Sequence, residues 1–123
     1  QAAKQAEQLL GQGSVILFPQ VRKYSYKPGT SKAIMACFAQ AAAAFDHNAA
    51  FDRLVIIGGG TSQGVLWQFG VEHLQLACAL EPGVAQGLML DGCFAGREFA
   101  LKGGSMGRED TLEKMLCRKE VVY

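Results

Sequence analysis

The feature that most constrains the fold is an apolar strand that runs directly into glycines. The run is Leu-Val-Ile-Ile at 54–57, and the residues that follow it are Gly58, Gly59, Gly60, Thr61 and Ser62. A short aliphatic run that stops at glycines is typical of a strand buried inside a sheet. Thr and Ser are favoured as helix N-caps, and Gly is favoured just past a helix end. The pattern predicts a strand over 53–57, a tight turn, and a helix that ends at Gly70.

The rest of the chain alternates helix-forming and strand-forming segments. We expect further helices over 2–10, 30–45 and 109–116, with Thr30 or Ser31 as the cap of the second. Further strands are expected over 14–19, 71–78, 87–90 and 97–102. A loop is expected over 21–29 and a turn over 81–83. Strands interleaved with helices predict an α/β fold, with a layered mixed or mostly parallel sheet and helices on both faces. The chain has 123 residues, of which 50% are hydrophobic, which is enough for one core and predicts one domain over residues 1–123.

Charge and hydropathy exclude two classes of partner. Lys and Arg number 12 against 11 Asp and Glu, a net charge of +1, so we expect neither a nucleic-acid partner nor an anionic membrane surface. The apolar runs are too short to cross a bilayer, and no signal or transit peptide is visible. The sequence opens with Gln1 instead of Met, and its first ten residues do not read as the beginning of a protein, so we expect a fragment or a processed product.

The cysteines predict a reducing compartment. Cys37, Cys78, Cys93 and Cys117 form no CxxC pair and have no histidine at zinc-finger spacing. We therefore expect four free thiols, with Cys37 and Cys78 buried in apolar stretches, and a cytoplasmic protein. We assign no metal ligand.

Three other conspicuous side chains are expected to be structural. His73 lies on a predicted strand and His47 at a helix end, where a satisfied or exposed ring is more common than a catalytic one. Trp67 lies on the helix after the glycines and is expected to be buried.

The first glycine turn has the chemistry of a phosphate-binding loop. Glycines between a strand and a helix let an anion approach the backbone N–H groups at the positive end of the helix dipole, and Thr61 and Ser62 add hydroxyl donors. The turn is not a dinucleotide fingerprint, because Gln63 stands where the third glycine belongs, and it is not a P-loop, because Val65 replaces the lysine. The alternative is an ordinary tight turn.

A second glycine loop follows the last predicted strand. Its residues are Lys102, Gly103, Gly104, Ser105, Met106 and Gly107. Loops after neighbouring parallel strands meet at the carboxyl edge of a sheet, where ligands of open α/β sheets bind. Lys102 would supply a point charge to a phosphate there, and the alternative is a solvated surface lysine.

These motifs, in this order, resemble the C-terminal nucleotide-binding domain of the four-carbon acid sugar kinase family. The matching residues are Gly58, Gly59, Thr61, Ser62, Pro82, Gly83, Val84, Leu101, Lys102, Gly104 and Gly107. The clear resemblance covers residues 53–116. In the family, a strand ends in a Gly-Gly-acidic-Thr-Ser loop, and a Pro-Gly-Val turn and a Leu-Lys-Ser-Gly-Asn-Phe-Gly stretch follow.

The resemblance implies a function. Family members use ATP, with Mg²⁺, to phosphorylate sugar acids such as threonate, erythronate or oxo-tetronate, which an N-terminal domain missing from this sequence binds. The implied nucleotide-binding residues are Gly58, Gly59, Gly60, Thr61, Ser62, Lys102, Gly103, Gly104 and Ser105. Catalytic residues are not assigned, and a homo-oligomer is compatible with this interpretation. Some members are described as type III secretion effectors of plant-associated bacteria.

Departures from the family pattern leave two alternatives open. The acidic residue of the first loop is Gly60 here, the glycine after Thr-Ser is Gln63, and the second loop reads Gly-Gly-Ser-Met-Gly. Loss of that carboxylate would remove a magnesium contact, unless Glu109 or Asp110 supplies one. The chain could therefore be a non-catalytic effector or interaction module with weakened nucleotide binding. It could also bind another phosphorylated metabolite.

Overall fold

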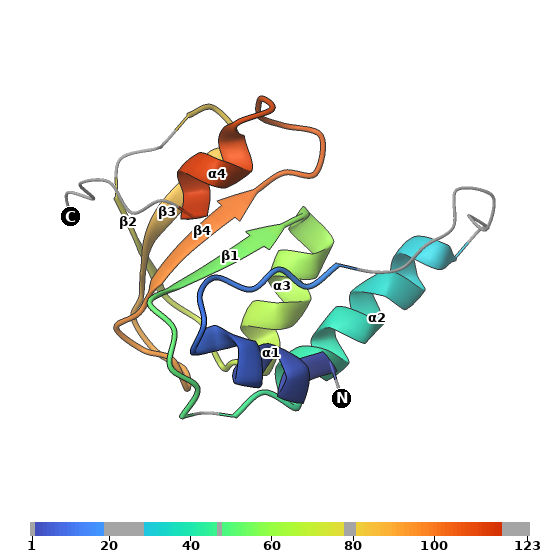
Figure 1. Cartoon of the computed structure of the whole chain (residues 1–123). Helices are drawn as coiled ribbons and strands as arrows, with labels where there is room; N and C mark the ends of the chain where they lie inside the picture. The colour runs from blue at the N-terminus through green and yellow to red at the C-terminus, as the bar shows by residue number, and fades with distance from the viewer. Residues whose placement is uncertain (1, 19–28, 47, 78–80, 117–123) are drawn as a thin grey trace.

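The computed structural model describes residues 2–18, 29–46, 48–77 and 81–116. Figure 1 shows the helices and strands of this part. In chain order they are α1 (Ala2–Leu10), α2 (Thr30–Ala43), β1 (Arg53–Ile57), α3 (Gly59–Gln68), β2 (Leu74–Leu76), β3 (Val84–Met89), β4 (Glu98–Lys102) and α4 (Thr111–Leu116).

The strands form one mixed sheet in the order β1-β4-β3-β2. β1 and β4 are parallel, whereas β3 runs antiparallel to both β4 and β2. Helix α3 packs on one face with α2 behind it, and α4 covers part of the other face (Figure 1). The prediction of an α/β fold with a mixed sheet and helices on both faces is confirmed.

The side chains of each strand point alternately to the two faces of the sheet, and they form two hydrophobic cores of unequal size. The larger core lies between the sheet and α3 and contains Ile56, Phe69, Met89, Phe94 and Phe99. Phe94 is 1% exposed, and its ring makes edge-to-face contacts with three other phenylalanines. The smaller core, beneath α4, joins Val84 and Ala100 to Met115. Successive strand residues point to opposite faces, so these two sets interleave in sequence.

The face beneath α4 also carries a buried ion pair. The Arg53 guanidinium lies 2.9 Å from the Glu98 carboxylate, and both side chains are buried. Arg53 also donates to the Gln86 side chain at 3.3 Å and to the Met115 carbonyl at 3.0 Å. One side chain thus connects β1, β4, β3 and the end of α4.

Two glycines allow turns or contacts that a side chain would block. Gly70 has φ 72° and lies just past the end of α3. Its N–H donates to the carbonyl of Trp67, and the N–H of Val71 donates to the carbonyl of Leu66. These two bonds form a Schellman motif, and the prediction that Gly70 closes the helix is confirmed. At Gly87 a Cβ would overlap the backbone carbonyl of Gln75, so only glycine lets β2 approach β3 this closely.

The predicted strand over 14–19 is wrong for the residues that the structure describes. Residues 14–18 form no strand, and Ile16 and Phe18 are 56% and 73% exposed. The local preference for extended structure is not enough, because the segment makes no backbone pairing with a neighbour.

The expected burial of two side chains is also wrong. Trp67 is 76% exposed, because α3 turns Val65 and Phe69 toward the sheet and packs Gly64 against Ala39 of α2, which leaves Trp67 on the outer side. Cys37 is exposed on α2. Cys37 and Cys93 are free thiols, as expected.

The predicted helix caps are wrong as well. α2 is capped by Gly29 and α3 by Gly58, both at positive φ and neither with a side-chain hydrogen bond. The hydroxyl residues stand inside the first turn of each helix instead of preceding it.

Smaller differences concern element lengths. β2 is shorter than the predicted 71–78, β3 begins earlier than 87, and the turn at 81–83 is present. The predicted loop over 21–29, apart from its last residue, and the expectations for His47, Cys78 and Cys117 lie outside the described residues.

Within the described residues, no helix combines the length and the apolar character needed to span a bilayer.

Candidate functional site

The structure brings the two glycine loops together at one edge of the sheet. β1 and β4 are parallel neighbours, with Ile57 opposite Lys102, so both strands end side by side. The Gly58 N–H donates to the Lys102 carbonyl at 2.8 Å, which joins the first loop directly to the second. The loops therefore share the carboxyl edge of the sheet, where open α/β sheets bind ligands.

The first loop is the beginning of α3 more than a separate turn. Gly58 is the cap, with φ 104° and ψ 128°, and Gly59 and Gly60 already lie in the helix. The first N–H groups of a helix have no partner within it and point out along the positive end of its dipole. Around the position where a Cβ of Gly59 would lie there is no heavy atom within 4 Å. An anion can therefore approach this backbone closely.

The two hydroxyls of the first loop differ in what they can do. The Ser62 side chain is buried, and its Oγ donates to the Gly58 carbonyl at 2.7 Å, so this hydroxyl stabilises the helix start. Thr61 is half-buried, and its Oγ1 lies 3.6 Å from the position where a Cβ of Gly58 would stand. Thr61 is the better placed of the two to donate to a ligand above the loop.

The second loop holds its lysine close to its own backbone. Lys102 Nζ donates to the carbonyls of Gly103 at 2.9 Å and Gly104 at 3.3 Å. Gly104 faces open space in the same way as Gly59, and Ser105 is exposed. The ammonium is therefore placed at the loop by two carbonyls, beside an accessible backbone.

The Pro-Gly turn at 81–83 belongs to the same edge. The Gly103 N–H donates to the Gly83 carbonyl at 3.3 Å. A Cβ at Gly83 would lie 2.7 Å from Cβ of Met106, so Met106 of the second loop packs directly over this glycine. Three motifs that are separate in sequence are contiguous here.

A methionine side chain lies above Gly60, where the family pattern has an acidic residue. A Cβ built on Gly60 would overlap the sulfur of Met35, which reaches over from α2. The space into which the acidic side chain of the family pattern would begin is therefore filled by a thioether. Sequence reasoning missed this contact, because Met35 lies on a different helix.

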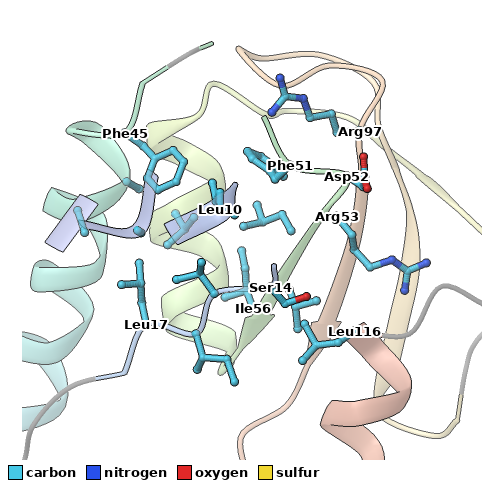
Figure 2. A pocket seen from close by; sticks show the side chains of 18 of the residues that line it. Leu10, Ser14, Leu17, Phe45, Phe51, Asp52, Arg53, Ile56, Arg97 and Leu116 are labelled. Carbon is cyan, nitrogen blue, oxygen red and sulfur yellow. The ribbon is translucent and has the colours of Figure 1, made fainter. Parts of the chain in front are cut away.

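A cavity lies beside this edge. It measures about 740 Å³ and extends along the outer side of β1, between residues 13–17 and helices α2 and α3. Figure 2 shows Leu10, Ser14 and Leu17 around it together with Ile56 and Phe45. Among the residues proposed to bind nucleotide, only Thr61 lines it. The sequence offered no sign of the cavity, because residues 14–19 were predicted to be a strand of the sheet.

A polar cluster at the opposite edge was not anticipated from the sequence. Asp91 accepts hydrogen bonds from the backbone N–H groups of Glu72 at 2.7 Å and His73 at 3.1 Å, and its carboxylate lies 2.7 Å from Nδ1 of His73. This hydrogen bond raises the pKa of His73 and lowers the pKa of Asp91. Ligand atoms of the three side chains lie within 4.8 Å of one another, so they could hold a cation. The backbone bonds show the structural role of Asp91, which anchors the entry to β2.

Burial shifts one further titratable group. The pKa of the Cys93 thiol is raised, chiefly because burial disfavours the thiolate. Cys93 is partly buried and packs against the larger core.

Comparison with known proteins identifies the family. The model of the nucleotide-binding C-terminal domain matches residues 2–112. The chain belongs to this family. The resemblance to the C-terminal domain of four-carbon acid sugar kinases is thereby confirmed. The match begins at residue 2, well before the 53–116 stretch that carries the motifs, so α1 and α2 are also part of the nucleotide-binding C-terminal domain.

Solved structures of the same fold are several times longer. Two crystal forms of a Bordetella bronchiseptica protein, a domain of unknown function (DUF1537) with bound citrate, are domain-swapped dimers. The first is 20% identical to this chain, with a TM-score of 0.68, and the match covers 91% of this chain and 28% of that protein. The second is 21% identical, with a TM-score of 0.67, and the match covers 85% of this chain and 26% of that protein. This chain thus spans little more than a quarter of those proteins.

A third structure is more distant in shape. A protein from Salmonella typhimurium LT2, described as a putative tRNA synthase, is 27% identical with a TM-score of 0.56, over 85% of this chain and 22% of its own. The search of curated proteins gave no significant match.

Proposed function

We propose that this chain is the ATP-binding domain of a kinase-like protein that phosphorylates a four-carbon sugar acid of the threonate, erythronate or oxo-tetronate type. The observation that carries the proposal is the direct bond from Gly58 to Lys102, which joins two glycine loops at the carboxyl edge of the sheet. Open space next to Gly59 and Gly104 supports it further, because a phosphate needs a backbone without side chains in its path.

In this proposal each part of the site has a different task. The first N–H groups of α3 hold phosphate oxygens, assisted by Thr61, and Lys102 supplies the positive charge. Gly103, Gly104 and Ser105 form the second wall of the site. The proposal assigns the sugar acid to residues outside this chain, and it is supported by the greater length of the Bordetella protein, of which this chain spans 28%. We propose that residues 1–123 act as one domain of such a protein.

The first loop fits ATP better than it fits a magnesium site. Residues 58–62 contain no carboxylate, and Met35 fills the space above Gly60. Asp110 is paired with Lys114 at 3.3 Å, and Glu81 accepts a hydrogen bond from Thr111 at 2.7 Å. These carboxylates thus have other contacts, and we derive no step that depends on a metal held by this loop.

A carboxylate placed at either open glycine should weaken ATP binding. Gly59→Glu and Gly104→Glu are each expected to raise the Kd for ATP at least about tenfold, because like charges about 6 Å apart repel by roughly 3 kcal/mol at an effective dielectric of 20. An acidic residue in the first turn of α3 is favourable to the helix, so folding should persist in Gly59→Glu. Titration calorimetry on the purified protein measures the affinities, and thermal unfolding checks the fold.

Gly11→Glu is the matched control for this experiment. Gly11 also faces open space, but it follows α1 and belongs to neither loop. The Gly11→Glu substitution adds the same negative charge and should leave the Kd for ATP unchanged. Equal weakening in all three variants would contradict the proposed site, as would no ATP binding by the unsubstituted protein.

The contact between Met35 and Gly60 favours a second candidate, a non-catalytic effector or interaction module with weakened nucleotide binding. If the loss of the family carboxylate is the only change that weakens the site, Gly60→Asp combined with Met35→Ala should restore Mg²⁺-dependent binding of ATP. The Kd for Mg-ATP should then be several-fold below the Kd for ATP in EDTA. Gly60→Asp alone should restore less, because the sulfur of Met35 occupies the same space. Calorimetry with and without Mg²⁺ compares the variants. Indifference of the double variant to Mg²⁺ would favour the non-catalytic module.

The proposal extends to the setting of the protein. A kinase-like protein that uses ATP belongs in the cytoplasm, and the free thiols Cys37 and Cys93 are consistent with this, whereas the second candidate corresponds to a secreted type III effector. Self-association is supported by the domain-swapped Bordetella dimers, and light scattering on the purified protein tests it.

A further inference from the structure

The outer edge of β1 is open. β1 is the first strand in the sheet order and pairs only with β4, and no described residue makes a backbone hydrogen bond to its other side. The 740 Å³ cavity lies along this edge, with Phe38 and Ala42 of α2 and Val65 of α3 in its walls. An unpaired edge next to a mostly apolar cavity is an unfavourable end for a sheet, which proteins usually cover.

Residues 14–18 have the composition and the place to cover that edge. Ser14, Val15, Ile16 and Leu17 line the same cavity as β1, and in Figure 1 the segment that follows α1 runs beside β1 in the same direction. Ile16 is 56%, Leu17 40% and Phe18 73% exposed. Consecutive large apolar side chains are thus in contact with water beside an apolar cavity. Val, Ile and Phe are residues that strands favour.

Chain topology fits a parallel strand at this position. Residues 14–18 precede α2, and α2 precedes β1, which is the order of a strand–helix–strand unit. Such a unit joins parallel strands of one sheet. The segment is as long as β1, which has 5 residues.

We propose that residues 14–18 close onto the outer edge of β1 as a parallel fifth strand, and that nucleotide bound at the adjacent glycine loop stabilises this closed form. The second half rests on the function proposed above. Parallel strands end at the same edge of a sheet, so closure brings Phe18 alongside Ile57 and Gly58. Thr61 already lines both the cavity and the first loop. A ligand that contacts the closed form better shifts the population toward it.

Hydrogen exchange on the full chain tests the pairing with ATP as the probe. Backbone amides of residues 14–18 and 53–57 should exchange at least tenfold more slowly when ATP is present. Unchanged exchange at 14–18 on a protein shown by calorimetry to be saturated with ATP would overturn the coupling. Protection at 14–18 that rises with protein concentration would mean a strand from a second copy, which would also overturn the proposal.

Two neighbouring proline variants provide a matched pair. Successive N–H groups of a strand point to opposite edges, so of Val15→Pro and Ile16→Pro only one removes a donor to β1. That variant should lose the protection and raise the Kd for ATP several-fold, and the other should keep both. Equal effects of the two, or none, would overturn the pairing.

The failure of the two proposals can be told apart. If calorimetry detects no ATP binding, the proposed function fails, while closure is still read from urea unfolding of the two proline variants without nucleotide. A lower midpoint for one of them supports the fifth strand, and identical midpoints overturn it.

Discussion

Replacing Arg53 by methionine is expected to lower the free energy of unfolding by about 3–5 kcal/mol, the cost typical of breaking a buried ion pair from one side. The guanidinium lies 2.9 Å from Glu98, whose residue is 4% exposed, and it also bonds Gln86 and the Met115 carbonyl. The substitution leaves the Glu98 charge in the interior without this counter-charge. Urea unfolding followed by circular dichroism measures the loss.

Two controls separate the charge effect from lost packing. Arg53→Met combined with Glu98→Met removes both charges and should recover about half of the loss or more. Lys114→Met removes the cation of an exposed ion pair with Asp110 and should change the free energy of unfolding by about 0.5 kcal/mol or less. A double variant no more stable than Arg53→Met would show that the uncompensated charge is not the cause.

Replacing Phe94 by alanine is the second change with a large expected effect, a loss of about 3–5 kcal/mol of unfolding free energy. Its ring centroid lies 4.7 Å from that of Phe51 and 4.8 Å from that of Phe69, and the Arg97 guanidinium stacks on it at 4.7 Å. Alanine would leave a cavity at the point where these groups meet, and it would remove the aromatic contacts and the cation–π contact together. Chemical unfolding measures the loss.

Trp67→Ala is the control for this second prediction. Trp67 is the larger aromatic residue but is 76% exposed on α3, so its replacement should change stability by about 0.5 kcal/mol or less. A loss at Trp67 as large as that at Phe94 would mean that the outer side of α3 is covered in solution.

The parts of the fold that could be predicted are those that local pattern determines. An aliphatic run followed by glycines predicts β1 and the start of α3. Alternating polar and apolar residues followed by glycines predict β4 and its loop. Both strands and both loops are present. Because parallel strands end at one edge, their convergence also followed from the sequence, and the bond from Gly58 to Lys102 confirms it.

The rest depends on contacts between distant segments. Residues 14–18 have every local property of a strand and no partner in the described structure, and Trp67 is exposed because α3 is packed on its other sides. Met35 above Gly60 joins two helices that no motif connects, and Asp91 reaches His73 only because β2 and β3 pair. Single-residue patterns contain no information on such pairs.

The parallel pairing of β1 with β4 has a consequence for the order in which the molecule can form during translation. Arg53 and its partner Glu98 are 45 residues apart in the chain. At a synthesis rate of roughly 5–20 residues per second, β4 is synthesised roughly 2–9 s after β1, with which it pairs. β2 and β3 lie between them and pair with each other locally, so their hairpin can form first. The most apolar strand of the sheet therefore spends the first seconds after its synthesis without β4 on its inner edge, and this is the interval in which a holding chaperone would protect the nascent chain from aggregation.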